Sequence, residues 1–291
     1  MLPSPTPKIR SRQIIESDIH AVVTLLAKGF PVHSHQFWLR VFESLAKHST
    51  PVGLPKYGHL LECNDVPVGV ILQIFSTIPA ATTSTTRCNI SSWYVEPAFR
   101  TYAAALVSQA LKPKSVTYLN ITAAPHTRAT VQAQGFSRYS SGVFVAIPAL
   151  SSRSNATPAT VVAGHICPEV HFESFERDLL LDHAAYGCMT LWCVTSDRAF
   201  PFVFRPRVIR GFMACTHLIY CRDIEDFIRF ARPIGMFLAM RGKPLVIVDS
   251  NAAVPGLVGK YLDGRMPKYF MGPDRPRLGD LAYTEAAMFG V

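Results

Sequence analysis

The chain has 291 residues, of which 49% are hydrophobic, 11% aromatic and 17% charged. This composition excludes a mainly disordered chain, and the length is close to the size at which one hydrophobic core divides into two. The apolar runs are far shorter than the roughly 18 residues of a membrane helix, and the opening MLPSPTPKIRSR lacks the apolar block of a secretion signal. We therefore expect a cytoplasmic protein without a membrane partner.

The formal net charge of +9 indicates an anionic partner. Lys and Arg are spread along the chain without a long basic run, which does not favour nucleic acid, whereas a phosphate-bearing cofactor needs only one basic site. The seven cysteines form no C-x-x-C pair and have no His at metal-ligand spacing. We expect buried, reduced thiols and no metal.

The first half alternates predicted helices and strands. Residues 1–8, rich in Pro and Ser, read as a loose tail. Apolar spacing then predicts, in order, helices over 19–26 and 37–45, a hairpin of strands 59–63 and 67–75 around Asn64-Asp65, strand 89–95, a helix after Pro97, strand 116–121, a helix over 127–135 and strand 142–147. This order predicts a mixed α/β (α+β) fold, with helices on the faces of a mixed sheet.

A polar stretch with two prolines, residues 148–160, is the predicted linker between domains 1–148 and 149–291. Beyond it the sequence predicts, in order, helix 173–186, strands 189–195, 200–204 and 216–221, helix 224–241, bent or broken at Pro233, and strand 245–248. The order of elements recurs at a constant offset, which pairs Trp93 with Tyr220 and Ala104 with Ala231. We infer an internal duplication and expect a second sheet in the C-terminal domain.

The segment SSWYVEPAFRTYAAAL, residues 91–106, carries the chemical signal. A strand turns through Glu96-Pro97 into a helix that begins near Arg100 and continues with three alanines. Small side chains let backbone N–H groups at a helix start approach an anion, and an arginine adds fixed positive charge. The segment is typical of a phosphate-binding turn, and equally of an ordinary turn with a small packing face.

This arrangement resembles the GNAT acetyltransferase superfamily. Its acyl-CoA loop reads Arg or Gln, two residues, Gly, one residue, then Gly or Ala, and residues 100–105 match it with Ala103 in place of the usual Gly. The helix pair before the hairpin, the strand NISSWYV and the later stretch ending in Gly135-Phe136 agree with the same family. The resemblance covers about residues 9–148.

The resemblance implies an acyl-CoA-dependent N-acyltransferase with acetyl-CoA as co-substrate. Strand 89–95 would splay from its parallel neighbour 116–121, which opens a slot for pantetheine. An amine of a small molecule or peptide would attack the thioester directly. The implied cofactor-binding residues are Trp93, Tyr94, Val95, Arg100, Thr101, Tyr102, Ala103, Ala104, Ala105 and Asn120. The alternative is a non-catalytic acyl-CoA-binding or scaffold protein with the same fold.

The implied acid and base are less well defined. Counting back from Gly135-Phe136 places Val131 where many relatives carry an acidic Tyr, and Ala124 where many carry Asn. The catalytic candidates are therefore Glu96, Tyr94 and Tyr139. Weaker alternatives are Glu62 as base, Tyr118 as acid, and His33, His35 and His59 on loops beside the acceptor slot.

The second half departs from the family pattern. At the repeat offset, Phe227, Phe230 and Arg232 replace Arg100, Ala103 and Ala105, and Asp223 stands at the predicted helix start. We expect the bulky side chains to block the approach of the backbone to phosphate, and the acidic start to repel it. The C-terminal domain is thus expected to be a degenerate GNAT-like copy. Its aromatic closing stretch would pack on the body of the protein or form a homodimer contact.

Overall fold

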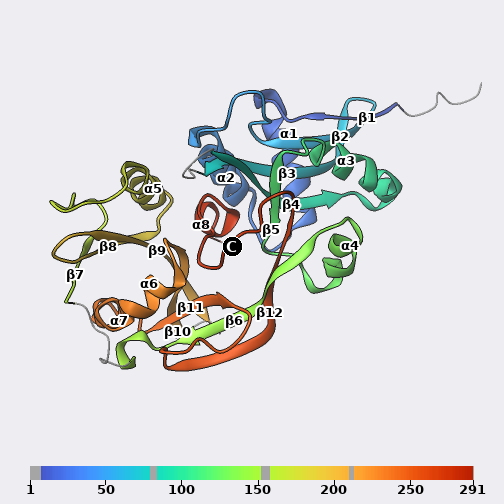
Figure 1. Cartoon of the computed structure of the whole chain (residues 1–291). Coiled ribbons are helices and arrows are strands. Elements are labelled where there is room, and N and C mark those ends of the chain that lie inside the picture. Colours follow the sequence, from blue (N-terminus) through green and yellow to red (C-terminus); the bar gives the residue numbers. More distant parts are fainter. Residues whose placement is uncertain (1–7, 79–83, 152–157, 210–212, 291) are drawn as a thin grey trace, which may run out of the picture. The chain divides into compact units, whose positions relative to one another are not determined.

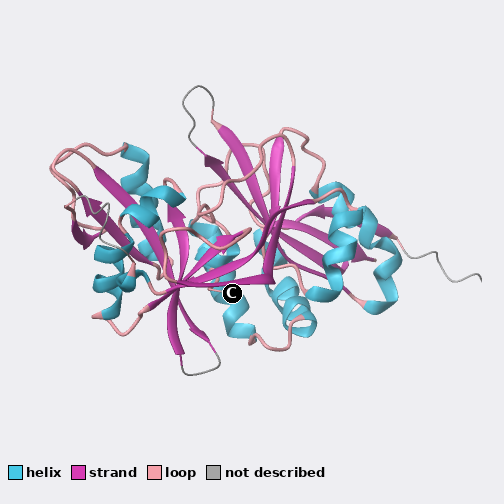
Figure 2. Cartoon of the chain, turned by 60° about the horizontal axis from the view of Figure 1, so that its bottom comes forward, coloured by secondary structure: helices cyan, strands magenta, loops and turns pink. Residues whose placement is uncertain are grey.

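The computed structural model describes residues 8–78, 84–151, 158–209 and 213–290. The chain divides into two compact units, of which unit 1 comprises Met1–Asn120 with Met271–Asp274, and unit 2 comprises Ile121–Phe270 with Arg275–Val291 (Figure 1). Both combine strands with helices (Figure 2). None of the described helices is both long and apolar enough to cross a membrane.

The described part of unit 1 contains five strands and three α-helices. In chain order they are β1 (Ile9–Gln13), the 3-10 turn η1 (Glu16–Asp18), α1 (Ile19–Gly29), α2 (His35–Lys47), β2 (Gly58–Cys63), β3 (Val66–Ile78), β4 (Thr85–Val95), η2 (Pro97–Tyr102), α3 (Ala103–Ala110) and β5 (Val116–Asn120). The strands lie in the order β1-β2-β3-β4-β5, antiparallel except for the parallel pair β4–β5. The mixed α/β fold predicted for this half is confirmed.

The β2–β3 hairpin forms where the sequence predicts it. Asn64 and Asp65 connect the two strands and both have positive φ, the conformation of a type I′ turn that matches the twist of a hairpin. The edge strand β1 was not predicted. Its sequence IRSRQ is too polar to show strand periodicity, and its arginines instead contact the buried Glu62 of β2.

Helices cover both faces of the unit 1 sheet. A Cβ on Gly69 of β3 would lie 3.5 Å from Leu106 of α3. The next residue, Val70, pairs with Tyr94, whose ring lies against Gly29 of α1. Because successive strand residues point to opposite faces, α1 and α3 lie on opposite sides of the sheet.

Unit 2 has the remaining elements. They are η3 (Pro125–Thr127), α4 (Arg128–Ala133), β6 (Ser137–Ala146), η4 (Pro148–Leu150), β7 (Thr160–Ala163), α5 (Ser174–Ala185), β8 (Met189–Val194), β9 (Ala199–Ile209), β10 (Met213–Cys221), α6 (Ile224–Arg229), α7 (Ala231–Ala239), β11 (Leu245–Ser250), β12 (Gly259–Met271) and α8 (Glu285–Met288). The strand order is β12-β6-β11-β10-β9-β8-β7, with β10–β11 as the parallel pair.

The internal repeat is confirmed by the strand register. The series β7-β8-β9-β10-β11 in unit 2 repeats the pairing of β1-β2-β3-β4-β5, including the final parallel pair. In unit 1, Asn89 pairs with Leu119, and in unit 2 Thr216 pairs with Val246. Each residue of the second pair stands one repeat offset after its counterpart in the first. The strand pairing of the first half is therefore repeated in the second half, as a tandem arrangement requires.

Four elements of unit 2 differ from the sequence prediction. Strands β7 and β12 and helix α8 were not predicted, and the predicted helix 224–241 is broken at Phe230, so that Pro233 lies in the first turn of α7, where proline is tolerated. The compact units divide after Asn120. Strand β6, which follows this point, hydrogen-bonds to β11 and β12 and therefore belongs to unit 2. The sequence-based boundary at 148/149 stays a prediction, and part of the predicted linker and most of the predicted tail lie outside the described residues.

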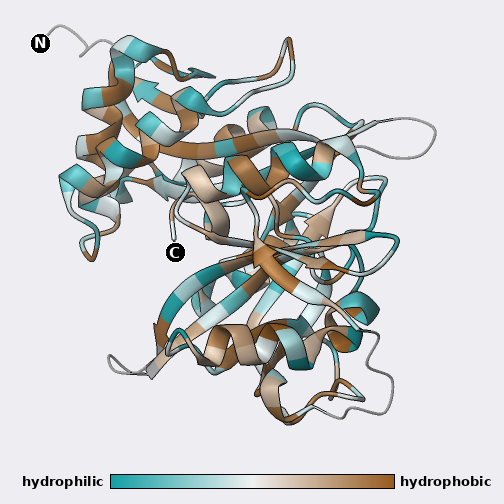
Figure 3. Ribbon diagram, turned by 90° about the vertical axis from the view of Figure 1, so that its left-hand side faces the viewer, coloured by the Kyte–Doolittle hydropathy of each residue, from teal (hydrophilic) through white to brown (hydrophobic). Residues whose placement is uncertain are grey.

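The core of unit 2 is aromatic on the face covered by α6 and α7. Phe202 and Phe204 of β9, Phe227 of α6 and Phe230 between α6 and α7 are fully buried in one cluster. Figure 3 shows the hydrophobic stretches of the strands and helices in brown. All seven cysteines are free and five are buried, in line with the expectation of reduced thiols, although Cys167 is exposed.

A buried polar cluster lies on the sheet of unit 2. Lys268 of β12 donates to Asp249 of β11 at 2.6 Å, and His217 of β10 contacts the same carboxylate at 3.2 Å. All three side chains are at least 97% buried. Burial opposes ionisation of Asp249, but Lys268 and His217 lower its pKa overall. Burial also lowers the pKa of His217, which keeps the imidazole neutral beside the ammonium group.

We expect Lys268→Met to lower the free energy of unfolding by about 3–5 kcal/mol, because it leaves a buried carboxylate without its counter-ion. Lys260→Met, at an exposed position of the same strand, is the matched control and should change stability by about 0.5 kcal/mol or less. Chemical denaturation at pH 7.5 measures both. Equal stability of the two variants would show that the ion pair contributes nothing.

Candidate functional site

Strand β4 separates from β5 halfway along its length. The parallel ladder joins Thr86–Asn89 to Val116–Leu119 and stops there, although β4 continues to Val95. A β-bulge follows directly. Between the pairs Val70–Tyr94 and Leu72–Ser91, β4 advances by three residues while β3 advances by two. Ser92 lies in this bulge with φ of 51°, a strained conformation for a residue with a side chain.

The bulge separates the end of β4 from its ladder with β5. The ladder with β5 does not extend to residues 92–95 of β4. The predicted residues Trp93, Tyr94 and Val95 occupy this stretch, and Asn120 ends β5 opposite it. The indole Nε1 of Trp93 is buried without a partner among the described residues. Unpaired groups of this kind require a ligand or water.

Tyr94 is held by the end of α1. A Cβ on Gly29 would overlap its ring, so any residue other than glycine at this position would displace the ring. Phe30 lies 6.4 Å from the same ring, centroid to centroid, and also packs on Trp38 of α2. The sequence indicated Gly29 only as a helix stop. Its contact with Tyr94 was missed, because nothing local in the sequence signals an interaction between residues so far apart in the chain.

Glu96 follows β4 and forms an ion pair with Lys28 of α1, with 2.5 Å between Nζ and Oε1. The carboxylate raises the pKa of Lys28. Because both groups are partly exposed, the pair is weak and can open. Glu96 thus lies beside Tyr94 at the end of the stretch beyond the ladder, with Lys28 as a partner that sequence reasoning did not identify.

The predicted phosphate loop is a 3-10 turn, η2, that runs directly into α3. Arg100, Thr101 and Tyr102 are exposed on η2, and Ala104 and Ala105 are exposed on the first turn of α3. The amide of Ala103, however, donates to the carbonyl of Arg100. It is therefore already satisfied, and the exposed side chain of Arg100 is the accessible cation of the predicted set.

Several weaker candidates lie elsewhere. Glu62 is buried in an ion-pair network with Arg10 and Arg12, which excludes it as a mobile base. The buried Tyr118 donates to the carbonyl of Pro113, and burial raises its pKa. The sequence placed His33, His35 and His59 on loops, but His59 is buried in β2 and His35 is the first residue of α2.

Tyr139 belongs to β6 of unit 2, where its buried ring contacts Phe270 edge to face. Unit 1 by itself therefore brings together Tyr94, Glu96 and the phosphate turn, but not Tyr139.

Comparison with solved structures identifies this architecture. The chain matches a proposed acetyltransferase from Pyrococcus horikoshii at a TM-score of 0.57 and 16% identity, over 94% of this chain and 93% of that one. It matches a GCN5-related N-acetyltransferase from Anabaena variabilis at 0.59 and 12%, over 90% and 72% of the two chains, and Eis1 from Mycobacterium abscessus at 0.51 and 11%, over 94% and 74%.

The chain has the GCN5-related N-acetyltransferase fold. No protein-family model and no curated protein sequence matches it significantly, and the low identities limit these comparisons to the fold.

In unit 2 the C-terminal segment of the chain occupies the corresponding edge of the GNAT-like sheet. The β10–β11 ladder ends at His217, and a bulge follows at Ile219, the repeat counterpart of Ser92. Beyond it, the amide of Cys221 donates to Gly279 at 2.9 Å, and the amide of Leu281 donates to Ile219 at 2.7 Å. The segment 279–281 thus pairs with β10 through an isolated bridge, beyond the end of the β10–β11 ladder.

The helix start in unit 2 is also closed to phosphate, by its acidic residues and not by the bulky side chains that the sequence also suggested. Phe227 and Phe230 point into the core and do not cover the loop, which corrects the expectation that they block it. The side chain of Asp223 instead caps α6 by accepting a hydrogen bond from the amide of Glu225 at 3.1 Å. A carboxylate already occupies the place of an anion.

We expect one acetyl-CoA to bind per chain, because only unit 1 has a basic helix start among the described residues. Isothermal titration of the full chain measures the number of sites. A stoichiometry of two would contradict the closed state of unit 2.

Proposed function

We propose that the protein is an acyl-CoA-dependent N-acyltransferase that uses acetyl-CoA and acts on an amine of a small molecule or peptide. The observation that carries the proposal is the stretch of β4 beyond its ladder with β5, which contains Tyr94 and leads into Glu96 and the basic turn at Arg100. The shared fold supports it.

The site residues suit the parts of an acyl-CoA molecule. The stretch from Trp93 to Val95 would bind the amide groups of pantetheine as an added strand would, and a backbone N–H there would stabilise the negative charge that develops on the thioester oxygen. Arg100 and the amides beside it would hold the pyrophosphate. Asn120 would contact the cofactor from the opposite side of the slot.

The acyl transfer requires one proton to leave the acceptor and one to reach the departing thiolate. Glu96, once released from Lys28, would take the proton of the ammonium group, and the amine would attack the thioester carbonyl directly. The hydroxyl of Tyr94 would then donate a proton to sulfur. Tyr139 remains a second candidate for this donor.

Binding of acetyl-CoA at about 100 times its dissociation constant should stabilise the chain by about 2.7 kcal/mol and raise the unfolding midpoint by about 5–10 °C. Arg100→Glu should abolish the rise, because it replaces the cation at the pyrophosphate by an anion. Lys114→Glu, an equal charge change at an exposed position beyond the other end of α3, should keep it. An unchanged rise in Arg100→Glu would show that the loop assignment is wrong.

Glu96→Gln should lower kcat by about 10²–10⁴-fold while the dissociation constant of acetyl-CoA stays unchanged, because the change removes the base without touching the cofactor. Glu43→Gln, at an exposed position of α2, is the control. Steady-state release of free CoA measures kcat. Full activity of Glu96→Gln would exclude this residue as the base.

The alternative function is a non-catalytic acyl-CoA-binding or scaffold protein. The ion pair of Glu96 with Lys28 and the Val131 that stands where relatives carry an acidic Tyr favour it. A panel of amines separates the two, because a scaffold binds acetyl-CoA without releasing CoA faster than the uncatalysed reaction.

A further inference from the structure

Unit 1 contains a cavity at the opposite end of α3 from the proposed cofactor turn. Its volume is about 210 Å³, and its walls come from β1, β2, β3, the C-terminal end of α3 and the loop before β2. Since α3 spans eight residues, about 12 Å of helix separates this cavity from the start of α3. The cavity has no part in the proposed acyl transfer.

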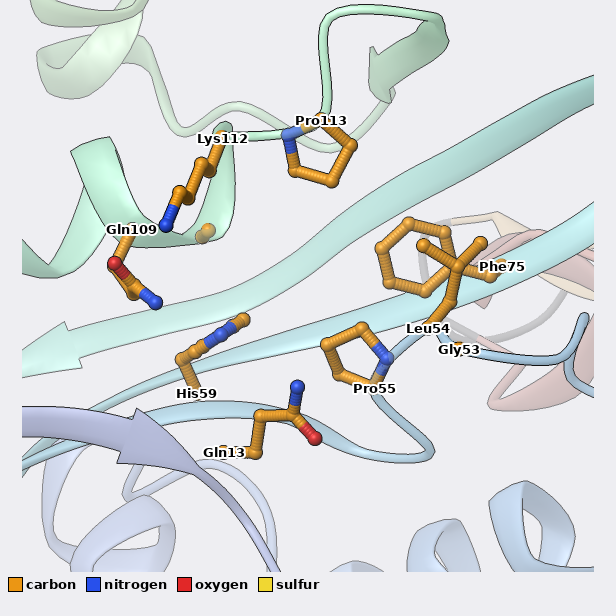
Figure 4. A pocket seen from close by; sticks show the side chains of 10 residues that line it. Gln13, Gly53, Leu54, Pro55, His59, Phe75, Gln109, Lys112 and Pro113 are labelled. Atoms are coloured by element: carbon orange, nitrogen blue, oxygen red, sulfur yellow. The ribbon is translucent and has the colours of Figure 1, made fainter.

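The cavity walls divide into a polar and an apolar side. Lys112, Gln109 and His59 lie along one side (Figure 4). The other side is formed by Leu54, Pro55 and Phe75. A ligand that contacts both sides must therefore carry an apolar body and a polar group.

The hydrogen-bond network below the cavity determines the tautomer of His59. The amide nitrogen of Gln73 donates to the carbonyl of Ala110 at 2.9 Å, so the amide oxygen of Gln73 faces Nδ1 of His59, 2.7 Å away. An amide oxygen only accepts, and Nδ1 must therefore carry the proton. Burial lowers the pKa of His59, although the bond to Gln73 acts in the other direction. The ring is thus neutral, and its Nε2 is a hydrogen-bond acceptor.

Nδ1 carries the one hydrogen bond of the His59 ring among the described residues, and Nε2 keeps contact with solvent although the residue as a whole is only 4% exposed. An acceptor on the wall of a solvent-connected cavity accepts a hydrogen bond from water, which a ligand with a donor group can replace. Cavity size limits the rest of that ligand. A cavity of about 150 Å³ holds benzene, so about 210 Å³ accommodates one six-membered ring with a small substituent.

We propose that this cavity is a binding site for a small phenol. The ring lies between Leu54, Pro55 and Phe75, and the hydroxyl group donates to Nε2 of His59. The amide of Gln109 and the ammonium group of Lys112 lie on the polar side, where they interact with the phenol oxygen or a polar substituent of the ring. The site is separate from the acyl-CoA site and does not depend on the proposed function.

Ligand-observed NMR titration of the full chain with phenol and with anisole tests the proposal. For a ligand of this size we expect a dissociation constant for phenol of about 0.1–10 mM. Anisole has the same ring and oxygen but no donor, and should bind at least tenfold more weakly. Equal binding of the two ligands would overturn the role of His59.

Leu54→Trp should abolish phenol binding, because the larger side chain fills the apolar side of the cavity. Val52→Trp introduces the same side chain at a fully exposed position two residues away and should leave the affinity unchanged. Circular dichroism spectra of both variants establish that they fold. Phenol binding that persists in a folded Leu54→Trp variant would place the ligand elsewhere and overturn the proposal.

Discussion

Both units depend on a parallel strand pair that is hydrogen-bonded over only a few residues. In unit 1 the pairing of β4 with β5 ends at Asn89, and in unit 2 the pairing of β10 with β11 ends at His217. A bulge directly after each ladder keeps the longer strand turned away from its neighbour. The backbone groups beyond the bulge still need partners, and what supplies them decides what each unit can do.

The two copies satisfy this requirement differently. Unit 2 uses its own segment 279–281, which pairs with β10. It also caps its helix with Asp223 and fills its core with Phe227 and Phe230. Unit 1 has Arg100 at the corresponding turn and a stretch of β4 beyond its ladder with β5. The same fold therefore pairs this stretch with its own C-terminal segment in one copy, and in the other copy we propose that an acyl-CoA binds there.

Much of the fold was predictable from the sequence. The hairpin at Asn64-Asp65 follows from turn chemistry, and most helices and strands of both halves follow from their apolar spacing. The polar edge strand β1 and the strand β12 were not predictable, because their pairing depends on partners far away in the chain. The candidate site was predictable in part. The segment around Arg100 indicates an anion site, but the ion pair of Glu96 with Lys28 and the contact of Tyr94 with Gly29 join residues that are distant in the sequence.

The sequence by itself determined the local elements, the internal duplication and the contrast between a basic and an acidic helix start, because each is written in the order of the side chains along the chain. Only the tertiary structure decided that Phe227 and Phe230 face the core, that Glu62 is ion-paired with Arg10 and Arg12, and that the C-terminal segment hydrogen-bonds to β10. These outcomes depend on which surfaces meet and which buried polar groups find partners. Both are properties of the packed chain, and no local pattern reports them.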